Sequence, residues 1–234
     1  ERIQREQETI WGKNHLSSNP FIVPSFVEHH LDRRLEDGRF IETKPWHWGQ
    51  FGLSRNHSIT PEFVERHLDK PWYWGKDGLS SNSSITPEFI EKHIDKPWHW
   101  GKDGLSSNPS ITSEFIERHF DKPWNWEAIC STKHTNFTTD FIERHLDKPW
   151  AWNSPYFSTQ SCITPEFIER HLDKPWHWGF MGLSENPNIT LEFVDRHMDK
   201  PWSWFSILNH LDFSRSDFLE RHYNIVKNEM SILL

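Results

Sequence analysis

The sequence predicts an all-α protein, an elongated α-solenoid of about eight 26-residue repeats with two short helices in each repeat. Three observations support this fold class. A Pro-Trp pair recurs every 26 residues, a second Trp follows the first by two positions, and a block of the form Phe-[Ile/Val/Leu]-[Glu/Asp]-x-His occurs eight times. Periods of this length are typical of stacked repeat proteins, in which each repeat buries its apolar face against its neighbours.

The repeated residues form columns along the chain. The His column contains His30, His67, His93, His119, His145, His171, His197 and His222, and the column of first Trp residues contains Trp46, Trp72, Trp98, Trp124, Trp150, Trp176 and Trp202. Sixteen positions separate His30 from Trp46 but only five separate His67 from Trp72, so the first repeat contains 11 extra residues. The last copy has no Trp pair. We therefore expect a single array, with an N-terminal capping repeat at 1–45, regular repeats at 46–204 and a C-terminal capping helix at 205–234.

The first half of each repeat carries the pattern of a helix start. In the segment 58–72, Thr60 is a good N-cap, Pro61 suits the first helical position, and Glu62 suits the positive end of the helix dipole. The residues expected on the core-facing side of this helix are Phe63, Val64, His67 and Leu68. We expect the helix to end before the Pro-Trp pair, because proline disfavours helical geometry in the residue that precedes it.

The second half of the repeat leaves two structures open. A second short helix beginning at Pro71 would place Trp72 and Leu79 on one face, although Gly75 and Gly78 weaken it by about 1 kcal/mol each. The Trp-x-Trp alternation is also compatible with a short extended segment. We favour the helix, because the copies "PWNWEAICS" and "PWSWFSILN" lack those glycines and carry helix-compatible residues.

Composition limits the classes of function. The net charge is −8 and the basic residues are scattered, which argues against nucleic acid as the main partner. No apolar run approaches the roughly 20 residues that span a bilayer, and the first residues do not resemble a signal peptide, so we expect no membrane span and no secretion. Cys130 and Cys162 occupy different repeat offsets and do not suggest a disulfide or metal pair. Glycosylation sequons at Asn56 and Asn188 are interpreted as incidental to the repeated loop.

The columns are interpreted as structural and not as chemical sites. A metal-binding or acid–base role for the His column is the alternative, but a zinc site needs three or four ligands at one point, and equivalent residues one repeat apart are too distant. We expect each His to bind a backbone carbonyl or the next repeat at a helix C-terminus. We also expect the Asp of each Asp-Lys-Pro-Trp segment to cap the second helix and the Lys to lie over a Trp face. No catalytic residue, metal ligand or cofactor is predicted.

A candidate partner-binding face is predicted where the copies differ. The residue between the two Trp residues varies, and this face comprises His47, Tyr73, His99, Asn125, Ala151, His177 and Ser203. The connectors after the second Trp, such as "GQFGLSRNHS" and "NSPYFSTQSC", vary as well. Repeat arrays commonly present variable positions to a partner on one face. The insertion near Arg34–Phe40 and the apolar end "MSILL" are added to this prediction.

The phrases "NPNITLEFVDRHMDKPWSW" and "ITPEFIERHLDKPWHWG" resemble the Trp-rich tandem repeats of proteins encoded by giant nucleocytoplasmic DNA viruses. The resemblance implies a viral origin and a repeat architecture. The leading hypothesis is a non-enzymatic scaffold for protein–protein interaction in the host cytoplasm or the virion, with a viral or host protein as its partner and with self-association through the array ends. A structural virion component is the alternative, and a metal- or nucleic-acid-binding repeat protein is the second alternative.

Overall fold

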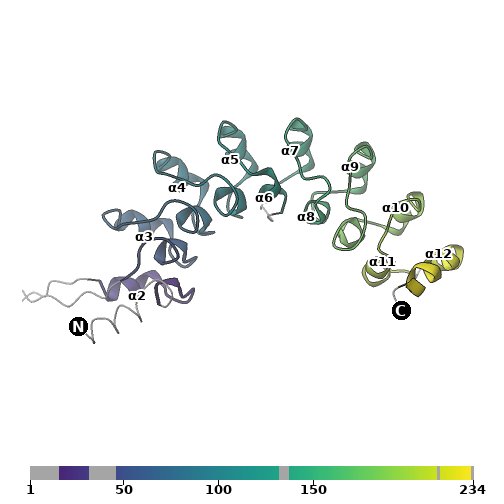
Figure 1. Cartoon of the computed structure of the whole chain (residues 1–234), viewed down its shortest axis with the longest axis horizontal. Helices are drawn as coiled ribbons and strands as arrows, with labels where there is room; N and C mark the ends of the chain where they lie inside the picture. The colour runs from purple at the N-terminus through teal and green to yellow at the C-terminus, as the bar shows by residue number, and fades with distance from the viewer. Residues whose placement is uncertain (1–15, 32–45, 132–136, 215–216, 233–234) are drawn as a thin grey trace, which may run out of the picture. The chain divides into compact units, whose positions relative to one another are not determined.

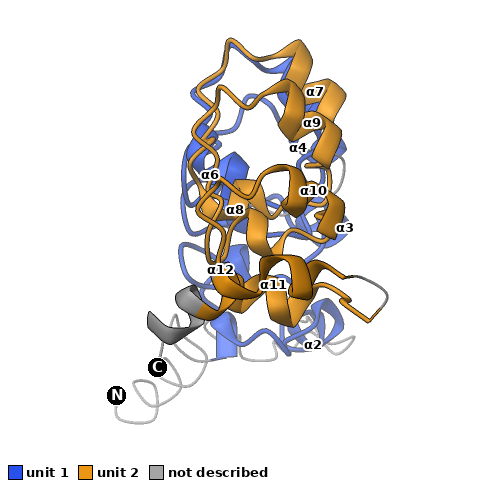
Figure 2. Ribbon diagram, turned by 90° about the vertical axis from the view of Figure 1, so that its right-hand side faces the viewer, with its two compact units in different colours: residues 1–136 blue, residues 137–234 orange. Residues whose placement is uncertain are grey.

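The fold is all-α, as predicted. In the computed structural model, residues 16–31, 46–131, 137–214 and 217–232 are described, and within them the chain forms eleven α-helices, five short 3-10 helices and no strand. The chain divides into two compact units, unit 1 at Glu1–Asn136 and unit 2 at Phe137–Leu234 (Figure 2). The insertion near Arg34–Phe40 and the last two residues lie outside the described residues, so the predictions made for them stay predictions.

Each repeat contributes one α-helix and one second element, and within each unit the two kinds of element lie on opposite edges (Figure 1). The repeat helices of unit 1 are α2 (Pro24–His29), α3 (Pro61–Arg66), α4 (Pro87–Lys92) and α5 (Ser113–Arg118), and its second elements are η1 (Leu16–Ser18), η2 (Leu53–Arg55), η3 (Leu79–Ser81), η4 (Leu105–Ser107) and α6 (Trp126–Ser131). The repeat helices of unit 2 are α7 (Thr139–Arg144), α9 (Pro165–Arg170), α10 (Leu191–Arg196) and α12 (Phe218–Ile232), and its second elements are α8 (Pro155–Ser158), η5 (Leu183–Glu185) and α11 (Trp204–His210).

The predicted start of the repeat helix is confirmed. Thr60 Oγ1 accepts a hydrogen bond from the main-chain N–H of Phe63, and Pro61 occupies the first helical position of α3. The same threonine cap recurs at Thr86, Thr112, Thr138, Thr164 and Thr190. Such a cap satisfies a donor that has no partner inside the helix, typically stabilising it by about 1 kcal/mol. Local sequence therefore fixes where these six threonine-capped helices begin.

The predicted core-facing stripe is only partly correct. Phe63 and Val64 are fully buried, but His67 is half-buried and Leu68 is 44% exposed. The α-helix ends at Arg66, and His67 has φ −127° and ψ 35°, which leave helical geometry. The helical periodicity that would bring Leu68 onto the buried face therefore stops before that residue is reached. Leu68 and its equivalents consequently lie at the surface.

The second half of the repeat takes two forms. In the copies with glycines, Trp72 to Trp74 lie outside any helix, and a 3-10 helix begins only at Leu79. In the copies without them, an α-helix forms, as in α6 and α11, which begin at the second Trp. A second α-helix is therefore confirmed for the glycine-free copies, but it begins at the second Trp or later and not at the Pro of the Pro-Trp pair. In the other copies the non-helical alternative holds at the Trp pair.

Candidate functional site

Aromatic side chains fill the contacts between consecutive repeats. The indole of Trp48 stacks on the Phe63 ring of the next helix at 6.3 Å between centroids, and it meets the edge of Trp72 at 5.1 Å. The same arrangement recurs with Trp74 and with Trp178 as the stacking indole. The first Trp of each pair is buried, with 5–8% of its surface exposed at Trp72, Trp98, Trp124, Trp150 and Trp176. These residues form the core between repeats, as their structural assignment predicted.

The indole N–H of the first Trp and the ammonium group of the Lys before each Pro-Trp pair also have internal partners. The indole N–H of Trp72 donates to the main-chain carbonyl of His67 at 2.8 Å, and every Trp of that column in the predicted set makes the same contact. Lys70 Nζ lies 6.0 Å from the centre of the Trp48 ring, which confirms the predicted cation–π position. Asp69 does not cap a second helix as predicted. Its carboxylate pairs with Lys70 at 3.0 Å, because no helix begins at this point.

The His column is part of a ladder of ion pairs between neighbouring repeats. His93 Nε2 lies 2.8 Å from Glu65 Oε1 of the preceding helix, and Lys92 Nζ lies 2.7 Å from the same oxygen. The imidazoles of His67, His119, His171 and His197 each face a Glu in the same way, with Nε2 to Oε1 distances of 3.4–3.6 Å. The longest of these distances fall within the range of an ion pair but not of a hydrogen bond. Hydrogen bonds from Lys92 and His93 lower the pKa of Glu65.

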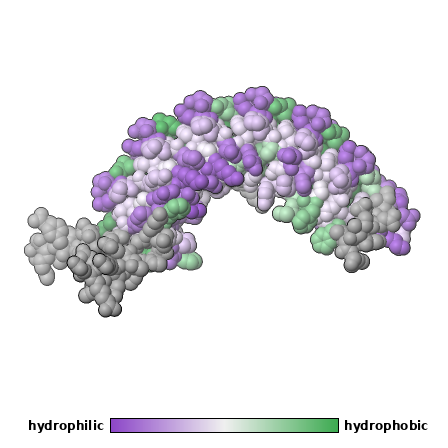
Figure 3. Space-filling view, in the orientation of Figure 1, coloured by the Kyte–Doolittle hydropathy of each residue, from purple (hydrophilic) through white to green (hydrophobic). Residues whose placement is uncertain are grey.

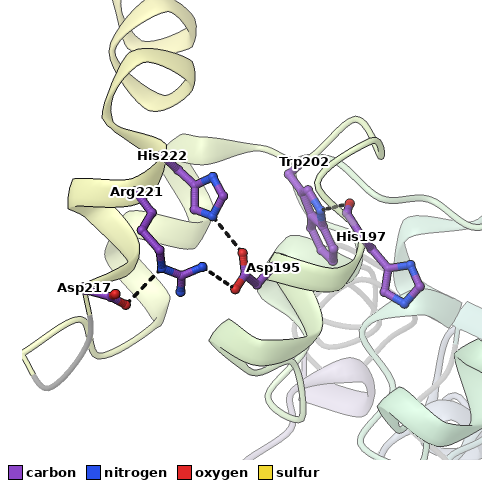
Figure 4. Close-up of polar contacts among 6 residues, drawn as sticks. All are labelled: Asp195, His197, Trp202, Asp217, Arg221 and His222. Carbon is purple, nitrogen blue, oxygen red and sulfur yellow. Dashed lines mark hydrogen bonds and ion pairs between the residues drawn. The ribbon is translucent and has the colours of Figure 1, made fainter.

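Figure 4 shows the last step of this ladder, in unit 2. Arg221 Nη1 donates to Asp195 Oδ2 at 2.7 Å, and His222 Nε2 faces Asp195 Oδ1 at 2.7 Å. Arg221 also binds Asp217 on its own helix. In six steps of the ladder, one carboxylate therefore faces both a column His and the Arg or Lys that precedes that His. Among the described residues, no group of three or more His, Cys, Asp or Glu side chains is placed to hold a metal ion.

A buried serine joins neighbouring repeats, and sequence reasoning missed it. Ser80 Oγ donates to the main-chain carbonyl of Trp74 in its own repeat and accepts from the N–H of His99 in the next at 2.9 Å. Ser54, Ser106 and Ser184 make the same pair of bonds. All four side chains are fully buried. The recurring "LS" inside otherwise variable connectors was the pattern that could have identified them.

A buried asparagine forms a second such connection. Asn82 Nδ2 donates to the carbonyl of Asn56 at 3.0 Å, and Asn108 Nδ2 donates to the carbonyl of Asn82 at 3.1 Å. Asn56 and Asn188, which begin glycosylation sequons, have side-chain amides bound to carbonyls of the preceding repeat. These asparagines therefore have a structural role in the folded chain.

The residues between the two Trp side chains are half-buried or exposed, but their variation has an internal cause. The imidazole Nε2 of His47, His99 and His177 binds a carbonyl three residues later at 2.8–3.0 Å, which closes the glycine-containing connector. Where the connector is an α-helix, Asn125 and Ser203 accept from the main-chain N–H three residues later and cap that helix. Five of the seven positions, namely His47, His99, Asn125, His177 and Ser203, therefore also have a role inside their own connector. Their role in partner binding stays a prediction.

A different column carries a large apolar or aromatic residue in every copy, and five of its eight members are exposed. The residue after each column His is Leu31, Leu68, Ile94, Phe120, Leu146, Leu172, Met198 or Tyr223. Leu68, Ile94, Leu146 and Leu172 are 42–44% exposed and Tyr223 is 59% exposed, whereas the neighbouring Phe and Val or Ile columns are almost completely buried except at Phe26 and Leu219, which are both 37% exposed. We call these eight residues the helix-end column. No helix in the described parts of the chain is long and apolar enough to cross a membrane.

Comparison with known proteins adds no further residues to this picture. No protein-family model matches the chain, and no curated protein and no solved structure matches it. The resemblance to viral Trp-rich repeats therefore stays a prediction, and the candidate surfaces rest on the geometry described above.

Proposed function

We propose that the chain is a non-enzymatic repeat scaffold that binds another protein through the helix-end column. One observation carries this proposal: the column keeps a large apolar or aromatic side chain in all eight copies, although five of those side chains are 42–59% exposed. Burial accounts for most of the other repeated apolar side chains, with Phe26 and Leu219 as exceptions. Within each unit the exposed members of the column recur in register, and exposed apolar patches are typical of protein interaction sites.

The surroundings of the column suit a protein partner. Asp and Lys follow six of the eight column residues, and Arg66, which pairs with Glu28 of the preceding repeat, lies two residues before Leu68. An apolar centre with a charged rim is the usual composition of a protein interface. Because the repeats resemble those of giant DNA viruses, we expect the partner among viral or host proteins.

Two double variants test the proposal, one in each unit. Leu68→Ser with Ile94→Ser and Leu146→Ser with Leu172→Ser remove four exposed side chains without touching the core. We expect both to lose partners that co-purify with the wild-type chain, as measured by quantitative mass spectrometry. Phe21→Ser is the matched control, because Phe21 is 87% exposed and lies outside the column. Circular dichroism confirms that the variants remain helical.

Two results would contradict the proposal. The first is a set of partners that both double variants retain at the wild-type level. The second is an equal loss of partners in Phe21→Ser, because the effect would then reflect general surface stickiness and not the column.

A further inference from the structure

Four large apolar side chains are exposed on the second elements of unit 2. They are Tyr156 on α8, Phe180 and Met181 in the loop before η5, and Phe205 on α11, with exposures of 54%, 58%, 44% and 52%. Hydrophobic surface is visible in this part of unit 2, near α8 and α11 (Figure 3). We call these four residues the unit 2 strip. It comes from the opposite edge to the helix-end column (Figure 1).

Hydrogen bonds hold the three elements of the strip together. The main-chain N–H of His177, which opens the loop before η5, donates to Ser158 Oγ on α8 at 3.3 Å. Glu185 Oε1 accepts from the main-chain N–H of Met181 at 3.0 Å and from Ser206 Oγ on α11 at 2.9 Å. One carboxylate oxygen therefore joins the loop to the residue after Phe205. The strip therefore draws its residues from three consecutive repeats that these hydrogen bonds connect.

The loop that carries Phe180 and Met181 is held in a strained conformation. His177 Nε2 donates to the Phe180 carbonyl at 3.0 Å, and Met181 has φ 59° in the left-handed region. The three equivalent residues of unit 1, Phe51, Asp77 and Asp103, also have positive φ, and the two Asp residues belong to a type that tolerates it better. Strain that is retained at an exposed apolar position is typical of a binding surface, and an ordered loop loses little entropy on binding.

Charge indicates the kind of partner. The segments 151–160, 177–186 and 203–210 contain no Lys or Arg and one carboxylate, that of Glu185, in a chain of net charge −8. The matching connectors of unit 1 carry Arg55, Lys76 and Lys102, of which Lys76 pairs with Asp103 at 2.9 Å and Arg55 with Asp77 at 3.3 Å. Exposed aromatic faces without nearby cations attract guanidinium groups, which stack on them. Leucine-like side chains suit the remaining apolar area.

We propose that the unit 2 strip docks a segment of another protein that carries both Arg and large aliphatic side chains. The guanidinium groups stack on the rings of Tyr156, Phe180 and Phe205, and the aliphatic side chains pack between them. Because the strip and the helix-end column lie on separate edges, the docking proposal and the scaffold proposal can fail independently.

Peptide binding to the full chain tests this proposal. The probe is a fluorescein-labelled peptide of about 12 alternating Arg and Leu residues, which extends about 40 Å and so covers several repeats. Binding is measured by fluorescence anisotropy at about 0.15 M salt. We expect this peptide to bind at least about tenfold more tightly than its Glu–Leu and Arg–Ser counterparts. Equal affinity for all three peptides, or no binding of the Arg–Leu peptide, would overturn the proposal.

Variants locate the site. Tyr156→Ser, Phe180→Ser and Phe205→Ser combined should weaken Arg–Leu peptide binding by about tenfold or more. Phe180→Ser alone is the second variant, since its side chain is mostly exposed and its loss leaves the core intact, and it should weaken binding in the same direction. Leu146→Ser with Leu172→Ser is the matched control in the same unit and should leave binding unchanged. Unchanged binding in both strip variants, or an equal loss in the control, would disprove docking at the strip.

Discussion

The side-chain amide of Asn82 donates a hydrogen bond to the main-chain carbonyl of Asn56, which stands 26 residues earlier in the preceding repeat. The same amide donates to the Ile59 carbonyl at 3.2 Å, and its oxygen accepts from the main-chain N–H of Ser84. Asn82 is fully buried. One side chain thus binds its own connector and the repeat before it, out of contact with solvent.

Asn82→Ala should reduce the free energy of unfolding by about 1–3 kcal/mol. The substitution leaves buried carbonyl and N–H groups of two repeats without a partner, and such groups are costly to bury. Urea denaturation monitored by Trp fluorescence measures the loss. Asn209→Ala is the control, because Asn209 is exposed and its amide binds only within its own helix. An equal effect of the two substitutions would contradict the inter-repeat role.

Two glycines in one loop should differ in their tolerance of alanine. A Cβ on Gly182 would lie 2.1 Å from the His177 carbonyl oxygen, whereas a Cβ on Gly179 would meet only the Pro201 carbonyl at 3.6 Å. Gly182→Ala should therefore destabilise the chain by about 1–3 kcal/mol, and Gly179→Ala should change stability by less than about 0.5 kcal/mol. Thermal melting of the two variants tests this. Similar melting temperatures would show that the close approach at Gly182 is not required.

Met181→Asn should stabilise the chain by about 1 kcal/mol. Met181 has a positive φ, which asparagine adopts at lower cost, and its side chain is 44% exposed, so little packing is lost. The same variant should weaken binding of the Arg–Leu peptide, because it removes an apolar side chain of the strip. Phe180→Asn, at a neighbouring residue without positive φ, should lower peptide affinity without raising the melting temperature. If the Met181→Asn protein were less stable than wild type, the backbone at this residue would not be strained.

Acid should destabilise the ladder between repeats. Hydrogen bonds from Lys92 and His93 hold the pKa of Glu65 below its ordinary value of 4.5, and Arg221 and His222 lower that of Asp195. A carboxylate with a depressed folded pKa contributes stability that is complete above its unfolded pKa and is lost as the pH falls through the folded value. The free energy of unfolding should therefore decrease as the pH falls below about 4.5.

Glu65→Gln separates this ladder from general acid effects. The variant should be less stable than wild type near neutral pH, and the difference should shrink below about pH 4.5, because the wild-type carboxylate is then protonated as well. Urea denaturation across a pH series measures both curves. A difference that stays constant with pH would mean that the charge of Glu65 contributes nothing.

Cys162 should be inert as a nucleophile in the folded chain. Burial raises the pKa of its thiol to about 11, so about one thiol in a thousand is ionised at pH 8. Alkylation by iodoacetamide should be slow in the native chain and fast in urea, with mass spectrometry giving the rate at Cys162. Rapid native labelling would show that the segment around Cys162 opens readily.

Sequence patterns predicted the parts of the repeat that depend on neighbouring residues. Thr60 and Pro61 specify a helix start within one turn, and the 26-residue spacing of the Trp pairs predicts the aromatic contacts between repeats. The sequence predicts Leu68 on the core side only when helical periodicity is extended past Arg66, the last helical residue. The backbone of His67 changes direction there, and no side-chain pattern indicates that change.

The candidate surfaces were less predictable. The position of His177 was expected to vary because it contacts a partner, but its ring closes its own connector, a contact that depends on the turn made by the glycines. Tyr156, Phe180 and Phe205 stand at unequal offsets from their Trp pairs, because α8, the loop before η5 and α11 differ in structure. Alignment of the copies alone could not show that these side chains share a surface.

The sequence by itself determined the period of the array, the starts of its helices and the identity of its aromatic core, because caps and stacking columns depend on residue type at fixed spacing. Only the tertiary structure decided which polar residues join the repeats and which apolar residues stay outside. Ser54 Oγ accepts from the Tyr73 N–H, 19 residues further along the chain, and a contact between atoms so far apart in sequence exists only after the chain has folded back on itself.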